Sequence, residues 1–145
     1  MHSVNRIGLA AIGLTLSLGG AVCRADIVAV VSSKSAITTL SKSQVADIFL
    51  GKVSRFPNGA QAVPIDQVEG SAARDEFYIK VAGKSPAQLT AYWSRMIFTG
   101  RGEPPKAVSN SIEVKKRVTE NAAAIGYIEA KLVDDSLRVV TLTGQ

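Results

Sequence analysis

The segment Val63–Phe77 constrains the fold most, because it predicts a short apolar strand, a tight polar turn and a helix start in immediate succession. Gly70 and Ser71 lie at the turn, so we expect Ser71 to cap the helix that follows. The first N–H groups of a helix have no partner within it, and this end carries a partial positive charge. Ser71 therefore marks a helix start that is either capped by this serine alone or also binds an anion.

Strands and helices alternate along the rest of the chain. The continuous apolar run Ile27–Val31 predicts a buried strand, and further strands are expected over 62–65, 124–128 and 137–142. Helices are expected over 41–50, 71–83, 85–98 and 112–120, the last capped by Ser111, with a loop over 99–105. This alternation predicts a single α/β domain with a central mixed sheet flanked by helices.

Apolar residues at helical spacing identify the faces that these helices should bury. Two such stripes are Val45, Ile48 and Phe49 in the first helix, and Val114 and Val118 in the last. Three aromatic residues of the third helix are also expected in the core, with a pocket lining as the alternative: Tyr92, Trp93 and Phe98.

The first 25 residues have the composition of an export signal. Arg6 precedes an apolar run over 7–22, and Cys23-Arg24-Ala25 forms a small-x-small site that predicts cleavage before Asp26. A membrane anchor is the alternative, but glycines interrupt the run and it is shorter than the roughly 20 residues of a span. Lipidation of Cys23 is a second alternative, disfavoured by the bulky residue before it. We expect a signal over 1–25, a mature domain over 26–145 and a periplasmic location.

The residue types of the mature domain exclude several kinds of chemistry. The only histidine and the only cysteine, His2 and Cys23, lie in the predicted signal. Residues 26–145 therefore cannot form a disulfide, a Ser-His-Asp or Cys-His catalytic system, or a histidine- or cysteine-based metal site. No nucleotide-binding glycine motif is present. We expect a binding protein with no catalytic residue, no metal and no cofactor.

The charge balance points weakly to anionic ligands. Without Arg6 and Arg24, the 17 basic residues fall to 15, against 12 acidic residues. This small positive excess favours an anionic small ligand or an anionic surface. No basic stripe is interleaved with aromatic residues, so we do not expect nucleic acid as a partner.

Two arginines are candidates for contact with an anion. Arg74 falls in the first turn after Ser71, where a cation opposes the helix dipole by about 0.3–1 kcal/mol. A bound anion at this helix start would make the position of Arg74 favourable. The alternative is that Arg74 forms an ion pair with Asp66 or Glu69. Arg101 lies on a glycine-flanked loop that either approaches a ligand or remains in solvent.

Three segments, taken in order, resemble the periplasmic substrate-binding proteins of phosphate-type ABC transporters. They are Leu40–Lys52, which contains Val-Ala-Asp-Ile-Phe-Leu-Gly-Lys, then Glu69-Gly70-Ser71, and then Ala124-Ile125-Gly126-Tyr127. The resemblance extends from about Asp26 to about Val140. It implies an α/β lobe of a two-lobed protein that binds its anion in the cleft through hydroxyls, helix-start N–H groups and an arginine.

The resemblance places this chain at the second lobe of that family, with no counterpart of the first lobe in this sequence. A second molecule would then supply the other wall of the cleft. The anion loop is also altered, because Ala72 and Ala73 stand where the family has Gly and Thr, and Asp66 stands about where an arginine is usual. The ligand-binding residues implied are Gly70, Ser71, Ala72, Ala73 and Arg74, with Arg101 as a further candidate.

Two functional hypotheses follow from these observations. The first is a non-catalytic periplasmic solute-binding protein for phosphate or a related oxyanion, with an ABC transporter permease as its partner. The alternative is an interaction module that has lost anion binding and docks on a membrane or periplasmic partner, or forms a homodimer. An enzyme relying on Ser, Lys, Asp and Glu alone is the least favoured.

Overall fold

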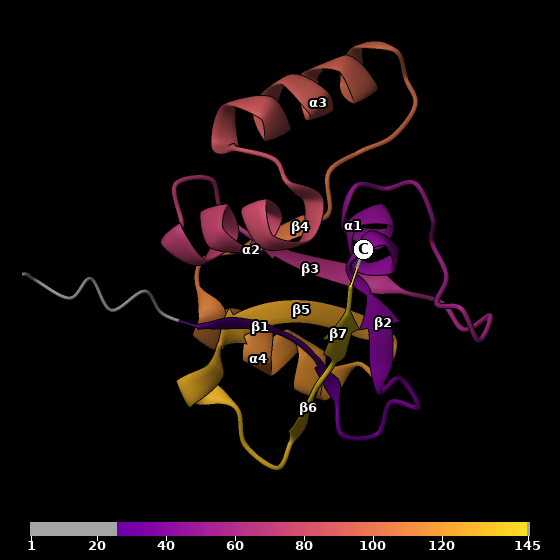
Figure 1. Ribbon diagram of the computed structural model, residues 1–145, viewed down its shortest axis with the longest axis vertical. Coiled ribbons are helices and arrows are strands. Elements are labelled where there is room, and N and C mark those ends of the chain that lie inside the picture. Colours follow the sequence, from indigo (N-terminus) through magenta and orange to yellow (C-terminus); the bar gives the residue numbers. More distant parts are fainter. Residues whose placement is uncertain (1–25, 145) are drawn as a thin grey trace, which may run out of the picture.

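A mixed five-stranded sheet forms the centre of the computed structural model, which describes residues 26–144 (Figure 1). The predicted export signal lies outside the described residues. The strand order is β4-β3-β5-β1-β6. β1 pairs antiparallel with β5 and β6, and β3 pairs parallel with β4 and β5. The bounds are β1 Ile27–Ser32, β3 Val63–Gln67, β4 Lys106–Val108, β5 Ala124–Glu129 and β6 Leu137–Val139.

The helices lie on both faces of this sheet, which confirms the predicted α/β class. Their bounds are α1 Lys42–Phe49, α2 Ala72–Ala82, α3 Pro86–Phe98 and α4 Ser111–Glu120, with a short 3-10 helix η1 at Ala130–Leu132. Alternate residues of β1 belong to different core clusters: Ala29 and Val31 pack with α1 and α2, whereas Val30 packs with α4. Both faces of β1 are therefore buried, as its continuous apolar run predicts.

Aromatic rings fill the core between the sheet and the α1–α2 face. The Phe77 ring of α2 stacks on the Tyr127 ring of β5 with centroids 4.0 Å apart. Phe49 of α1 meets Phe77 edge-on at 4.8 Å. Such contacts add to the free energy gained from burying the rings, so they fix α1 and α2 against β5.

On the opposite face, α4 packs directly on β5. Val114 and Val118 are both fully buried, as predicted. A Cβ atom added at Gly126 would lie 2.4 Å from Val114 Cγ1 and 3.1 Å from Val118 Cγ2. Only a glycine lets the helix approach the strand this closely.

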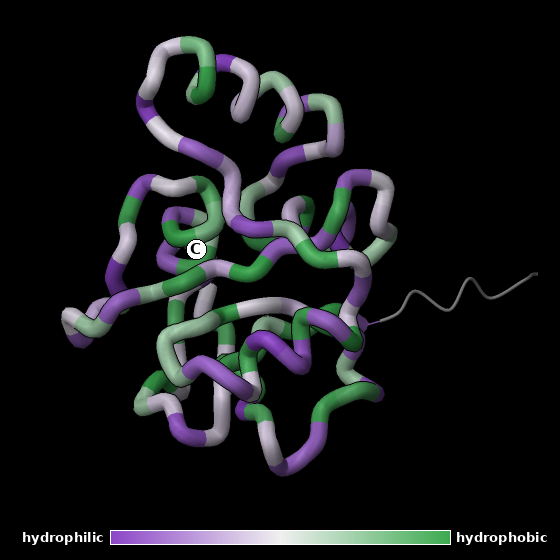
Figure 2. The backbone as a smooth tube through the Cα atoms, turned by 180° about the vertical axis from the view of Figure 1, so that it is seen from behind, coloured by the Kyte–Doolittle hydropathy of each residue, from purple (hydrophilic) through white to green (hydrophobic). Residues whose placement is uncertain are grey.

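Helix α3 lies beyond α2 and away from the sheet (Figure 1). It contacts the core through buried Leu89 and Trp93, and the Tyr92 hydroxyl donates a hydrogen bond to the Leu50 carbonyl oxygen at 2.6 Å. Phe98 is 91% exposed, so its predicted place in the core is wrong. It belongs to the last turn of α3, and Figure 2 shows this helix apart from the sheet, with hydrophobic and hydrophilic colours alternating along it.

The last strand and the cap of α4 differ from the sequence prediction. The last strand, expected as one piece over 137–142, is divided into β6 and β7 (Thr141–Thr143). Val140 between them is buried and donates its N–H to Ala29 O, while β7 pairs parallel with β2 (Thr39–Ser41) in a separate small sheet. Asn110, not Ser111, caps α4, because its Oδ1 accepts a hydrogen bond from Glu113 N at 3.0 Å.

Within residues 26–144 the longest helix has 13 residues, and none is long and apolar enough to cross a bilayer.

Candidate functional site

Ser71 caps α2 as the sequence predicts. Its Oγ accepts a hydrogen bond from Arg74 N at 3.3 Å, and its hydroxyl donates to Gln67 Oε1 at 2.9 Å. The preceding Gly70 has φ +91°, a conformation that suits glycine and turns the chain from β3 into the helix. The Ser71 side chain is therefore fixed in place rather than free to rotate.

Gln67, the last residue of β3, holds two helix starts together. It is buried, and its Nε2 donates hydrogen bonds to Ser111 Oγ at 3.0 Å and to the Tyr127 carbonyl oxygen at 3.1 Å. Ser111 begins α4, and Ser71 caps α2. One glutamine side chain thus fixes the N-terminus of α2 beside the N-terminus of α4.

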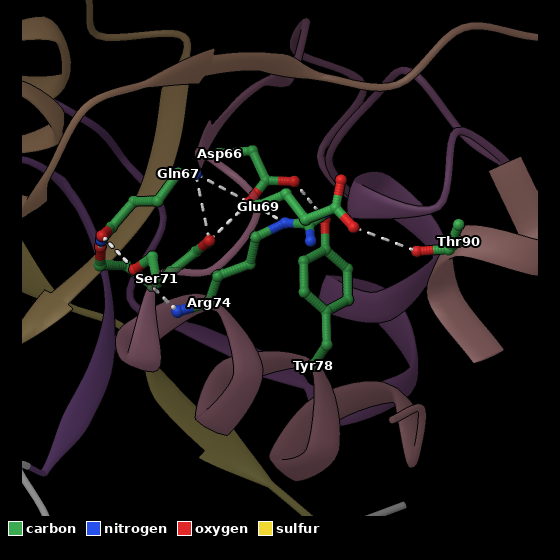
Figure 3. A network of polar contacts seen from close by, with 8 residues as sticks. Asp66, Gln67, Glu69, Ser71, Arg74, Tyr78 and Thr90 are labelled. Atoms are coloured by element: carbon green, nitrogen blue, oxygen red, sulfur yellow. Dashed lines mark hydrogen bonds and ion pairs between the residues drawn. The ribbon is translucent and has the colours of Figure 1, made fainter. Parts of the chain in front are cut away.

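An open hollow of about 430 Å³ lies at these two helix N-termini, and we name it the helix-start hollow. Its charged lining residues are Glu69 and Glu129, and none of its lining residues is a lysine or an arginine. Both charged residues of the lining are acidic, but the Glu69 carboxylate is directed toward Thr90 of α3, with its Oε1 3.5 Å from Thr90 Oγ1 (Figure 3). Its lining comprises residues 67–73, 109–111 and 129, which include the predicted Gly70, Ser71, Ala72 and Ala73.

One carboxylate oxygen of this hollow lacks a partner. Glu129 ends β5, and its Oε2 atom is buried with no hydrogen bond to any of the described residues. A buried acceptor without a donor costs about 1–3 kcal/mol, and more if it is charged. The Oε2 atom therefore lowers the stability of the fold beside the hollow unless the side chain turns toward a donor.

Arg74 is not among the residues that line the helix-start hollow. Its Nε lies 3.8 Å from Asp66 Oδ1, and its guanidinium carbon lies 5.6 Å from the centroid of the Tyr78 ring. Figure 3 shows Arg74 and Tyr78 directed from α2 toward Asp66. The structure thus has the ion pair that the sequence offered as the alternative to an anion contact at Arg74.

Asp66 is the centre of a buried polar network. This residue is 3% exposed, and its Oδ2 accepts a hydrogen bond from the Tyr78 hydroxyl at 2.6 Å. The Tyr127 hydroxyl donates to Oδ1, and Gln67 N donates to the same oxygen at 2.8 Å. A buried carboxyl group normally has such partners, so Asp66 has a structural role beneath the hollow rather than a place in its wall.

The two tyrosines of this network keep their protons. Burial raises the pKa of both Tyr78 and Tyr127 far above the usual value of 10.0, and the nearby Asp66 carboxylate raises it further. Neither hydroxyl is available as an acid or base near neutral pH. Their function is to donate hydrogen bonds.

The remaining candidate residue lies elsewhere. Arg101 is exposed in the loop between α3 and β4 and does not line the helix-start hollow. Among residues 26–144 no group of three or more carboxylate, histidine or cysteine side chains is placed to hold a metal ion.

No protein-family model matches the sequence, and no curated protein does. A phosphate ABC transporter substrate-binding protein from Clostridium perfringens with bound phosphate is 25% identical, with a TM-score of 0.65. The match covers 80% of this chain and 44% of that one. This chain has a periplasmic-binding-protein-like fold.

Two further solved structures support the same fold. An ABC-type phosphate transport receptor from Vibrio cholerae is 17% identical with a TM-score of 0.57, over 80% of this chain and 45% of its own. A possible phosphate-binding protein from Planctomyces limnophilus is 15% identical with a TM-score of 0.60, and the match covers 81% of this chain and 41% of that one. This chain therefore spans less than half the length of each neighbour, which agrees with the single lobe that the resemblance implies.

Three functional candidates escaped the sequence analysis: Gln67, Asn110 and Glu129. The partners of Gln67 lie far away in the sequence, because it reaches Ser111 and Tyr127, which are 44 and 60 positions away. A buried polar residue at the end of an apolar strand, next to a helix cap, was the signal available for Gln67.

Proposed function

We propose that this domain is a non-catalytic solute-binding module that takes phosphate or a related small oxyanion into the helix-start hollow. The observation that carries the proposal is that Gln67 holds the N-termini of α2 and α4 at one hollow. The first-turn N–H groups of two helices, which have no partner within their helices, then face the same space. The phosphate bound to the Clostridium perfringens protein supports this ligand class.

The charges in the hollow specify the ligand further. With Glu69 and Glu129 in its lining and no cationic side chain there, a ligand with two full negative charges is repelled. We infer that the bound species is a singly charged, protonated oxyanion, which the acidic lining repels less than a doubly charged one. Binding should then be tighter in mildly acidic than in mildly alkaline solution.

The cellular role follows from the same comparison. We propose that the protein is exported to the periplasm and works with the permease of an ABC transporter. Another domain, which closes over the hollow, would supply the opposite wall of the ligand site.

Isothermal titration calorimetry of residues 26–145 with phosphate and with sulfate tests this proposal. Ser71→Ala should weaken binding about tenfold, because it removes the hydroxyl that orders the α2 start. Ser85→Ala is the matched control, because Ser85 caps α3 in the same way but lies outside the hollow. Glu129→Gln should reduce the pH dependence. Absence of binding at millimolar phosphate would refute the function.

A docking module is the second candidate, and the surface beside the hollow favours it. Val68 lines the hollow and is 44% exposed, and Ile112 at the start of α4 is 57% exposed. A partner, or a second copy, that covers the hollow would bury both side chains. If no oxyanion binds, and sedimentation shows self-association that Val68→Ser and Ile112→Ser abolish, the docking function replaces the first.

A further inference from the structure

A second hollow of about 530 Å³ lies between α1, the loop that follows it and the C-terminal end of α2. We name it the lysine hollow, after Lys42, Lys52 and Lys84 in its lining. It shares no lining residue with the helix-start hollow. These three lysines come from three separate segments, so the tertiary structure, not a local run of charge, brings them to one place.

The positive charge of this hollow is only partly balanced. Asp47 also lines it, and its Oδ1 lies 4.0 Å from Lys52 Nζ. Within the described part of the chain, neither Lys42 nor Lys84 forms an ion pair, although both are half-buried. Two uncompensated ammonium groups at one hollow repel each other. An anion between them would attract both and offset that repulsion.

Lys84 is held near the hollow by an aromatic ring. Its Nζ lies 5.4 Å from the centroid of the Tyr92 ring, within the range of a cation–π interaction. Tyr92 is itself fixed, because its hydroxyl donates to the Leu50 carbonyl oxygen. The ammonium group is thus positioned at less entropic cost than that of a lysine extended into solvent.

The floor of the lysine hollow is apolar. Ala46 and Leu50 of α1 and Val81 of α2 line it, and all three belong to the core. Small-molecule sites commonly have volumes of about 300–1,000 Å³, with an apolar lining and a few charged groups that fix the ligand's orientation. An apolar floor with a basic rim matches a ligand that has both an anionic group and a compact apolar body.

We propose that the lysine hollow binds an organic oxyanion, a phosphate monoester or a carboxylate with a small apolar body. The anionic group lies between Lys42 and Lys84, and the apolar body rests on Leu50 and Val81. This site is separate from the helix-start hollow and differs from it in preferring an organic over an inorganic anion. It does not depend on the function proposed above.

Protein-observed NMR titration with phenyl phosphate tests the proposal, with phenol and inorganic phosphate as matched ligands that lack the charge or the apolar body. Phenyl phosphate should bind at the lysine hollow at least several-fold more tightly than either. The Lys42→Gln, Lys84→Gln double variant should weaken it about tenfold. Asp47→Asn should strengthen it, because that carboxylate opposes the ligand. Lys116→Gln, on the exposed face of α4, should leave it unchanged.

Three results would overturn the proposal: equal affinity in the double lysine variant, equal affinity for phenyl phosphate and inorganic phosphate, or the same loss in Lys116→Gln. Ser71→Ala separates the two sites, because it alters the helix-start hollow alone. If Ser71→Ala abolishes phenyl phosphate binding, the ligand occupies the helix-start hollow. The lysine hollow then fails as a site while the oxyanion-binding function stands.

Discussion

Replacing Tyr127 by phenylalanine removes one hydroxyl from the buried network around Asp66 and leaves the ring in place. The ring still stacks on Phe77 at 4.0 Å, so the packing between β5 and α2 is retained. The variant loses the hydrogen bond that the hydroxyl donates to Asp66 Oδ1 and the one that it accepts from Gln67 N. Gln67 N keeps its contact with Asp66 Oδ1 at 2.8 Å, so the main loss falls on the carboxylate.

The magnitude follows from the burial of that carboxylate. A hydrogen bond to a charged group contributes about 1.5–3 kcal/mol to stability, because the charge that remains has no water to replace the lost donor. Asp66 is 3% exposed, so we expect Tyr127→Phe to lower the free energy of unfolding by about 2 kcal/mol. For a domain of this size, that corresponds to a fall in Tm on the order of 5–10 °C.

Urea unfolding at neutral pH measures this change. Far-UV circular dichroism reports the whole domain, and the fluorescence of Trp93, the only tryptophan, reports the packing of α3. Coincident transitions would justify a two-state fit. Tyr92→Phe is the matched control, because that hydroxyl donates to the neutral Leu50 carbonyl oxygen and its loss should cost only about 0.5–1.5 kcal/mol. If Tyr127→Phe costs no more than Tyr92→Phe, the network does not hold a buried charge and the reasoning is refuted.

Two further predictions concern the same core. Burial and Asp66 raise the pKa of Tyr78 and Tyr127 in the folded protein, so their contribution to stability is complete below the unfolded pKa of 10.0 and declines as the pH rises above it. Above pH 10, the free energy of unfolding should fall by about 1.4 kcal/mol per pH unit for each of these two tyrosines. Urea unfolding at a series of alkaline pH values should show half this slope for Tyr127→Phe, and an unchanged slope would contradict the linkage. Gly126→Ala should lower stability by about 1–3 kcal/mol or more, because its Cβ would lie 2.4 Å from Val114 Cγ1. In a Val114→Ala background, Gly126→Ala should cost less stability. Thermal unfolding of the original protein, the two single variants and the double variant measures this coupling, and additive effects would contradict the importance of the close approach of α4.

Local sequence signals predicted most of the fold. Ser41 and Ser85 form capping boxes with Gln44 and Gln88, and the helices begin at the next residue in each case. Gly83 ends α2 in a left-handed conformation, where glycine is favoured. These signals act within one turn of a helix, so they can be read without knowledge of distant contacts.

The errors arose where distant contacts decide the outcome. Val140 interrupts the predicted last strand because its N–H bonds Ala29 O in β1, and the next residues pair with β2 instead. Phe98 has an apolar side chain at helical spacing, yet it remains exposed at the end of α3. Hydrophobic periodicity identifies a face but does not say whether another part of the chain covers it.

The candidate site was predictable in its helix start but not in its electrostatics. Ser71 was identified from its place at the turn. The role of Arg74 could not be decided in the same way, because the spacing agrees equally with an anion contact and with an ion pair to Asp66. Glu129 follows Ala-Ile-Gly-Tyr-Ile in the sequence as the end of a strand, and nothing local indicates that this residue lines the same hollow as two helix starts. Functional geometry of this kind arises from contacts between segments dozens of residues apart.

The charges around β3 determine which groups remain free to contact a ligand. Asp66 stands about where the phosphate-type family is expected to have an arginine, and a carboxylate there needs internal donors. Tyr78 and Tyr127 supply them, and Arg74 lies 3.8 Å away as an ion-pair partner, so the cation of α2 compensates the protein's own carboxylate. The helix-start hollow then has backbone N–H groups and no side-chain cation. If phosphate binds there as proposed, binding depends on helix dipoles and on a proton carried by the ligand. The pH dependence of binding, more than its affinity, would then distinguish this domain from one that binds its anion through an arginine.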